Sequence, residues 1–253
     1  MRASIFVTDD LRFHLCNGQV SYIFEVSPEG IVEHCHFGGA VSEIEQLPIK
    51  TRRLYRACSL FFQDVPNYNL NDVAQEYPVF GSSDHRHPAI HIVNDEGNST
   101  HVFRYQSHQV LDAKADVDGL PSAHGGDKDE SASLMIVLKD EQAQVSVELY
   151  YTIYAEHDVI SRSAKVINHG CKSVVLKGVM SSCLDLPVVD YDVLHLTGSW
   201  GRELHENRFA LPKGRFVIDS ANGTSGNAHN PFIAIMERSC SERQGNALSL
   251  IHI

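Results

Sequence analysis

The stretch LMIVLKDEQAQVSVELYYTIY, residues 134–154, carries the clearest signal for the fold. Two runs rich in β-branched and aromatic residues, 134–139 and 144–154, flank a short polar segment. Such runs favour strands, because branched and aromatic side chains pack well on a pleated surface. The polar residues between them, KDEQ at 139–142, have the composition of a turn. The stretch therefore predicts two consecutive strands joined by a short connection.

Runs of the same character recur along the chain. Those expected to form strands are LRFHLC, VSYIFEV, GIVEHCHF, AIHIVN, THVFRY, DVISRSAKVIN, SVVLKGVMSSCL, DVLHLTG, GRFVID and NPFIAIME. Turn sequences separate them, for example SPEG at 27–30 and INHG at 167–170. No segment predicts a helix longer than about three turns, the usual length in globular proteins. Strands without helices between them predict an all-β protein in which sheets pack face to face as a large sandwich.

Two segments are less regular. Residues 112–131 are rich in Gly, Asp and Ser, which predicts a long exposed loop rather than a linker, because strands of the same character follow it. Residues 41–80 mix aromatic residues with turn formers, which predicts a loop packed on a surface. A length of 253 residues is ordinary for one all-β domain, so we expect a single domain.

The charge balance excludes some functions. The chain has 21 Lys and Arg against 32 Asp and Glu, a formal net charge of -11. A nucleic-acid-binding protein needs a basic face to neutralise phosphates, so we expect no nucleic-acid partner. Binding to an anionic membrane surface is disfavoured for the same reason.

The cysteines and the apolar runs bear on the compartment. None of the six cysteines belongs to a C-x-x-C pair, so neither a zinc knuckle nor a thioredoxin-like motif is indicated. The start, MRASIFVTDDLRF, has no sustained apolar region, and no run approaches a membrane span. We therefore expect no secretory signal, no membrane segment and a cytoplasmic protein with reduced thiols.

The stretch GSSDHRHPAIH, residues 81–91, has the appearance of a metal site. His85, His87 and His91 stand in an H-x-H-x3-H pattern. A zinc site needs a further ligand and support from neighbouring groups, and nothing nearby supplies an obvious set. The chain has fifteen histidines, so chance clusters are common. We expect no metal here, and a metal-dependent enzyme remains a third-ranked hypothesis.

Asp84 and Arg86 in the same stretch form a second pattern. If the stretch is a strand, these two side chains share one face, and Pro88 places the segment at a sheet edge or at the start of a strand. An Asp and an Arg so placed either pair with each other or offer an acceptor and a fork of donors to a ligand. The spacing by itself favours a structural ion pair.

The single tryptophan, Trp200, lies in the sequence GSWGRE. A tryptophan beside a turn glycine and a charged pair can fill a core. It can equally act as a platform, because the C–H face of a sugar packs well on an indole.

Several blocks carry a family resemblance. EYPVFGSSDHRHPA resembles the pattern E-x-P-x-x-G-x-x-D-x-R-x-P-A, and LYYTIYAEHDVISRSAKVINHG resembles L-x-Y-x-I followed by D-x-I-x-R-S and N-x-G. MSSCLDLP, GSWGRE and DSANGTSGNAHNPF follow in the same order. The ordered set, over about residues 4–237, resembles the N-terminal domain of α-galactosidases of glycoside hydrolase family 36.

The resemblance implies a fold and a set of site residues. The family's domain is a large β-supersandwich, which agrees with the strands expected above. Asp84 is implied to reach into the active site of a neighbouring subunit and contact galactose, with Arg86 as its supporting partner. Trp200 is implied to line the sugar pocket, while Arg202 and Glu203 are expected to fix their loop by an ion pair.

The chain departs from the family pattern in two places. Ser225, Gly226 and Asn227 stand where the family has Ser-Ser-His, so this site is expected to be a turn only. After residue 247 the family is implied to continue into a catalytic (β/α)8 barrel, whereas this chain ends in LSLIHI. We therefore expect the family domain over 1–247, a non-native tail over 248–253, and no barrel.

The implied function depends on the absence of the family's catalytic carboxylates from these 253 residues. Retaining glycosidases need two carboxylates, and the family's two catalytic aspartates lie on the barrel. Asp185 and Asp190 are not placed with Asp84 by any pattern, so no catalytic residue is expected here. The resemblance implies the non-catalytic part of an α-galactosidase, inactive by itself and without a cofactor. It would contribute contacts to a homotetramer and part of a pocket for raffinose- or melibiose-type α-galactosides.

Two further alternatives stay open. The chain is either such a part or a stand-alone carbohydrate-binding β-sandwich, which would have a formed pocket around Trp200 and affinity for galactose as a monomer. Other activities of the family, such as synthesis of raffinose or stachyose or removal of α-N-acetylgalactosamine, would be decided by the barrel.

Overall fold

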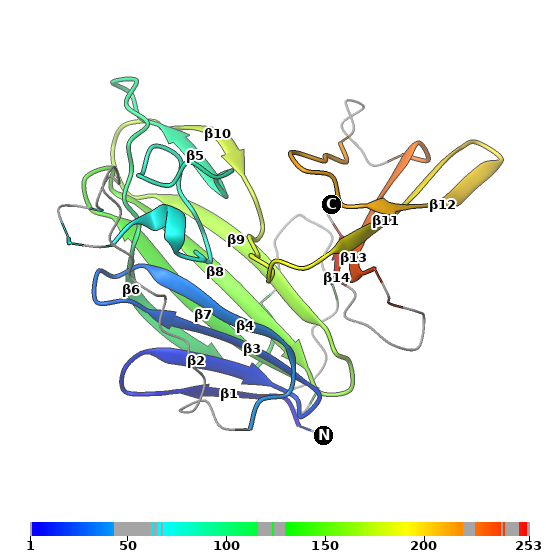
Figure 1. The fold of residues 1–253 in the computed structure, drawn as a ribbon. Helices are drawn as coiled ribbons and strands as arrows, with labels where there is room; N and C mark the ends of the chain where they lie inside the picture. The colour runs from blue at the N-terminus through cyan, green and yellow to red at the C-terminus, as the bar shows by residue number, and fades with distance from the viewer. Residues whose placement is uncertain are drawn as a thin grey trace. The chain divides into compact units, whose positions relative to one another are not determined.

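The computed structural model describes residues 2–42, 62, 65, 66, 68–115, 123, 130–219, 226–238, 240 and 248–251. In this part of the chain the regular structure is almost entirely antiparallel strand, as predicted (Figure 1). No helix among these residues is long and apolar enough to span a membrane. Backbone contacts divide the chain into two compact units, Met1–Asp185 and Leu186–Ile253, and each is described by itself. The expectation of a single domain over 1–247 stays a prediction.

The described residues of the first unit form two four-stranded antiparallel sheets and one ribbon. One sheet has the order β1 (Ser4–Val7), β2 (Arg12–Cys16), β3 (Val20–Val26) and β4 (Val32–Gly39). The other has the order β6 (Arg104–Leu111), β7 (Ser131–Asp140), β8 (Val145–Tyr154) and β9 (Ile160–Asn168). The ribbon pairs β5 (Ile90–Val93) with β10 (Val175–Val179).

The opening stretch of sequence forms β7 and β8, and its alternation sets the core. Leu134 pairs with Tyr151 and Ile136 with Leu149, and all four side chains are buried. They share one hydrophobic cluster with buried residues of β2 and β3, such as Phe13. The two sheets therefore pack face to face, and the predicted sandwich is confirmed.

The segment that precedes β5 packs along one edge of the first sheet. The N–H of His34 donates to the carbonyl of Ala74, and the N–H of Glu76 donates to the carbonyl of Val32. A short 3-10 turn, η3 (Leu70–Asp72), begins the segment. The described part of residues 41–80 is thus a loop packed on a surface, as expected, while residues 43–61, 63, 64 and 67 lie outside the described residues.

A buried charged network joins this segment to both sheets. Glu76 is 0% exposed, and its Oε2 lies 2.9 Å from Nη2 of Arg162 on β9. Tyr22 and Tyr151 each donate a hydroxyl hydrogen bond to the same carboxylate, and Nδ1 of His34 lies 2.7 Å from Oε1. These partners compensate the Glu76 carboxylate for the loss of water, because an ionised carboxylate buried without partners would destabilise the fold.

The network fixes the charge states of its members. Burial by itself raises the pKa of Glu76, but the Arg162 guanidinium and the His34 hydrogen bond outweigh it, so that the pKa lies below its ordinary value of 4.5. Burial by itself lowers the pKa of Arg162, yet Tyr151, Tyr22 and Glu76 raise it above its ordinary value. The pair is therefore ionised at neutral pH.

The lowered pKa of Glu76 predicts a pH dependence of stability. Because the folded-state pKa lies below the unfolded value, this contribution is fully present above about pH 4.5 and is lost as pH falls through the folded pKa. We expect the free energy of unfolding in urea to fall more steeply between about pH 5 and pH 3 in the wild-type chain than in Glu76→Gln. Equal slopes for the two chains would contradict the assignment.

The second unit is built on one antiparallel sheet, with the order β12 (Arg202–Ala210), β11 (Tyr191–Ser199), β13 (His229–Glu237) and β14 (Leu248–Ile251). His195 packs edge-on against Phe209 and Phe216, with ring centroids 5.7 and 5.4 Å apart. Residues 248–251, expected to belong to a non-native tail, pair with β13 as a strand. Their origin stays a prediction.

Several strand predictions need correction. The strand expected at 100–105 instead begins at Arg104, because the N–H of Val102 donates to the carboxylate of Asp140 and not to a ladder. Residues 214–219 form no strand, and Phe216 packs into the aromatic cluster instead. β1, β12 and β14 were not expected, and the sequence of β12, RELHENRFA, shows no apolar alternation.

Candidate functional site

The 81–87 loop, which connects the packed segment to β5, is held rigidly. Gly81 has a φ of 83°, and a Cβ atom built there would lie 2.3 Å from the carbonyl oxygen of Ser99. Only glycine permits this close approach of two backbones. On the other side, the side chain of Asn71 donates to one backbone carbonyl of the loop at 2.9 Å and accepts from one backbone N–H at 2.8 Å.

The carboxylate of Asp84 lies inside the loop. Its Oδ1 accepts from the backbone N–H and from Nε of Arg86, at 2.9 and 3.0 Å. Its Oδ2 accepts from Nη2 of Arg86 at 2.9 Å and from Nε2 of Gln75 at 2.6 Å. The side chain is 1% exposed. The ion pair favoured by the spacing is confirmed, on a loop instead of a strand, and the implied contact with galactose stays a prediction.

Arg86 also joins distant parts of the chain. Nη1 lies 2.7 Å from Oδ2 of Asp185, and Nη2 donates to the carbonyls of Leu70 and Val73. Burial by itself lowers the pKa of Arg86, but the hydrogen bonds and charges of Asp84 and Asp185 raise it above its ordinary value. The guanidinium, with its side chain 38% exposed, is the charged group that this loop presents at the surface.

Asp185 is the site residue that sequence reasoning missed. It lies 99 positions from Arg86, and no local pattern in MSSCLDLP indicates a partner. The structure shows that its carboxylate and that of Asp84 both form ion pairs with the guanidinium of Arg86.

The three histidines of the 81–91 stretch do not converge. His85 and His87 are exposed, and Nδ1 of His87 lies 3.0 Å from the carbonyl oxygen of Pro88. His91 stacks on Phe80 with ring centroids 3.8 Å apart. The described residues contain no group of three or more His, Cys, Asp or Glu side chains placed to hold a metal ion.

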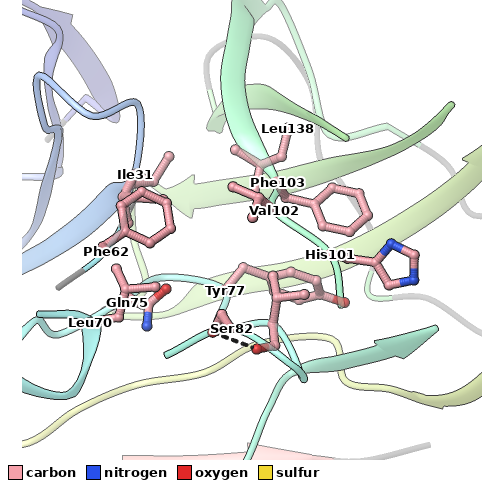
Figure 2. Close-up of a pocket in the computed structure, with 12 residues that line it drawn as sticks. Ile31, Phe62, Leu70, Gln75, Tyr77, Ser82, His101, Val102, Phe103 and Leu138 are labelled. Carbon is pink, nitrogen blue, oxygen red and sulfur yellow. Dashed lines mark hydrogen bonds between the residues drawn. The ribbon is translucent and has the colours of Figure 1, made fainter. Parts of the chain in front are cut away.

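A small cavity lies behind the 81–87 loop (Figure 2). Its walls are mostly apolar and include Leu70, Phe103 and Leu138. The hydroxyl of Ser82 at its edge donates to the carbonyl of Val79 at 2.9 Å, the dashed line in Figure 2. A volume of about 20 Å³ holds one water molecule and no sugar ring.

Trp200 occupies the turn between β11 and β12 and is 91% exposed. Gly201 after it has a φ of 73°, and Oε1 of Glu203 accepts from the N–H of Gly201 at 2.8 Å. The expected ion pair between Arg202 and Glu203 is not among the ion pairs of the described residues. Successive side chains of a strand point to opposite faces, so Arg202 and Glu203 do not face each other.

Asn227, at the position where the resemblance implies a histidine, contributes to the same turn. Its Nδ2 donates to Oε1 of Glu203 at 3.2 Å. Gly226 forms a single antiparallel bridge with His229 next to it. Residues 226–229 therefore form a turn, but not the turn without a polar contact that was expected, because Asn227 bonds to Glu203.

The structure gathers the predicted site residues into two groups. Asp84 and Arg86 belong to the first unit, together with the unexpected Asp185. Trp200, Arg202 and Glu203 belong to the second. Each group is built from hydrogen bonds within its own unit.

Comparison with known proteins assigns the family. The model of the glycosyl hydrolase family 36 N-terminal domain matches residues 30–252. The chain is 33% identical over 239 residues to α-galactosidase AgaA of Geobacillus stearothermophilus, covering 92% of this chain. It is 32% identical over 254 residues to α-galactosidase Mel36A of Lactobacillus acidophilus, covering 98% of this chain.

Solved structures agree. The crystal structure of α-galactosidase AgaB from Geobacillus stearothermophilus superposes with a TM-score of 0.91 at 32% identity, covering 97% of this chain and 34% of AgaB. A variant of AgaA in complex with raffinose superposes with a TM-score of 0.88 at 34% identity, covering 94% of this chain and 33% of that one. The chain spans about a third of the length of these relatives. It belongs to the glycosyl hydrolase family 36 N-terminal domain family.

Proposed function

We propose that this chain is the non-catalytic portion of an α-galactosidase that hydrolyses terminal α-D-galactosyl residues of galacto-oligosaccharides with retention. The observation that carries the proposal is the match of nearly the whole chain to about a third of proteins named α-galactosidases. The two catalytic carboxylates that retention requires would lie in the remaining part of the enzyme. This chain by itself would be inactive.

In the proposed enzyme, the chain contributes contacts to a homotetramer and part of the sugar pocket. A tryptophan 91% exposed at a braced turn supports this role, because an indole offers a flat apolar face to a sugar ring. Separately, Asp84, supported by Arg86 in the 81–87 loop, would contact the galactose in the active site of a neighbouring subunit. The AgaA variants bound to raffinose and to stachyose support α-galactosides of this type as substrates. We place the enzyme in the cytoplasm.

The proposal is tested by replacing Trp200 in the full-length enzyme that contains this chain. We expect Trp200→Ala to raise KM for raffinose about tenfold, with a smaller change in kcat, because stacking contributes to binding of ground state and transition state alike. Val188→Ala is the matched control, since Val188 is a fully exposed apolar residue of the same unit. It should leave both constants unchanged.

The chain of 253 residues serves as the second arm of the experiment. We expect it to release no nitrophenol from a nitrophenyl α-galactoside. Clear turnover by the chain would overturn the non-catalytic assignment, and an unchanged KM in Trp200→Ala would overturn the pocket role. Strong galactose binding by the isolated monomer would favour the stand-alone carbohydrate-binding module instead.

A further inference from the structure

A polar cleft of about 420 Å³ opens in the first unit, apart from the 81–87 loop. Three connections border it: the loop that follows β5, the turn between β7 and β8, and the turn between β9 and β10. They supply residues 94–96, 98, 100 and 101, residues 140 and 142–144, and residues 170–174. The volume is within the range of about 300–1,000 Å³ that small-ligand sites usually occupy.

The framework of the cleft is rigid. Asp140, buried at its base, accepts from the backbone N–H groups of Gln142 and Ala143 through Oδ1. Its Oδ2 accepts from the N–H of Val102 at 3.0 Å and lies 3.2 Å from Nδ1 of His101. One carboxylate thus locks the turn between β7 and β8 to the loop that follows β5. Because these connections are already ordered, little conformational entropy is lost when a ligand binds.

The charged groups of the cleft are already occupied. Nζ of Lys172 lies 2.7 Å from Asp95 and 3.8 Å from Glu96, and this pair links two of the three connections. Asp140 has four hydrogen-bonding partners, so both of its oxygens are engaged. Little charge is left over to attract an ionic ligand.

The uncommitted groups of the cleft are neutral. Within the described part of the chain, the side chains of Thr100, Gln142, Gln144 and Ser173 line the cleft and make no hydrogen bond. Their hydroxyls and amides both donate and accept. A ligand that matches them carries many neutral groups that also donate and accept, which is the chemistry of a sugar's hydroxyls.

We propose that this cleft is a carbohydrate-binding site, which holds one or two sugar rings of a neutral oligosaccharide. None of its lining residues is Trp, Tyr or Phe, so no aromatic face adds to the hydrogen bonds. The affinity is therefore weak, with a Kd on the order of 1 mM. The inference does not rest on the proposed hydrolytic function, because the site lies within one unit and its test involves no turnover.

The test is a titration of the 253-residue chain with stachyose, followed by the amide resonances of the isotope-labelled protein. The shifts are expected to fall in residues 94–101, 140–144 and 170–174. The double variant Gln142→Ala/Ser173→Ala is expected to bind at least about tenfold more weakly, because two hydrogen bonds to the sugar are lost. The matched control is Ser107→Ala/Gln109→Ala, two exposed residues of β6 outside the cleft.

The outcomes separate cleanly. Shifts confined to the cleft, together with unchanged binding in the control variant, support the site. No shift at a stachyose concentration of about 50 mM, or shifts elsewhere only, overturns it. Equal affinity of the wild type and the cleft double variant also overturns it. If the double variant fails to fold, the map of shifts in the wild-type chain decides, since it needs no substitution.

Discussion

Replacing Arg162 by methionine is expected to lower the free energy of unfolding by about 3–5 kcal/mol, because the buried Glu76 carboxylate loses its only fully charged partner within the described network. Methionine keeps much of the side-chain volume, so the loss reports the charge rather than a cavity. The measurement is urea unfolding at neutral pH, followed by the ellipticity of the sheets.

Lys165→Met is the matched control for this prediction. Lys165 lies on the same strand, three residues beyond Arg162, and forms an ion pair with Glu148 at 3.4 Å on an exposed surface. An exposed pair contributes about 0–1 kcal/mol. If Arg162→Met lowers the free energy of unfolding no more than Lys165→Met does, the prediction is wrong. The Glu76 carboxylate would then be stabilised sufficiently by its other partners.

Replacing Gly81 by alanine is expected to be the second most damaging change. The left-handed backbone costs about 1–2 kcal/mol for an alanine. The added Cβ would also meet the carbonyl oxygen of Ser99 at 2.3 Å, so one of the two loops must move. Overpacking of this kind adds about 1–3 kcal/mol, which gives an expected total of about 2–5 kcal/mol in urea unfolding.

Gly97→Ala separates the two contributions. Gly97 has a φ of 82°, nearly the same as Gly81, but a Cβ there has no atom within 4 Å. We expect this control to show only the backbone term of about 1–2 kcal/mol. In the full-length enzyme, Gly81→Ala should also raise KM, because the displaced loop carries Asp84 and Arg86. If the two substitutions lower the free energy of unfolding equally, the backbone near Ser99 can move away from the added Cβ atom at little cost.

The strands were predictable where burial imposes a pattern. β3, β7 and β8 alternate or are apolar throughout because they face the core of the first unit. β12 was not predictable, because most of its side chains are exposed and burial therefore imposes no apolar alternation on its sequence. Residues 214–219 show the reverse case, in which an apolar run packs without a neighbouring strand.

The site was predictable only where its contacts are local. Asp84 and Arg86 are two residues apart, so their ion pair follows from spacing and from the fork geometry of arginine. Gln75 and Asp185 reach the same groups through tertiary structure, and nothing in their own neighbourhoods indicates it. Glu76 and Arg162 belong to two blocks of the resemblance, yet their meeting as one buried pair requires the packed sheets.

The position of β12 at the edge of its sheet has a consequence for solubility. An edge strand presents unpaired N–H and C=O groups that can recruit a strand of another molecule and start aggregation. β12 carries charged side chains at Arg202, Glu203, Glu206 and Arg208, and burying these against a foreign strand would be unfavourable. The hairpin of β11 and β12 can therefore expose Trp200 to solvent. The charges on β12 disfavour the addition of a strand from another molecule to this edge.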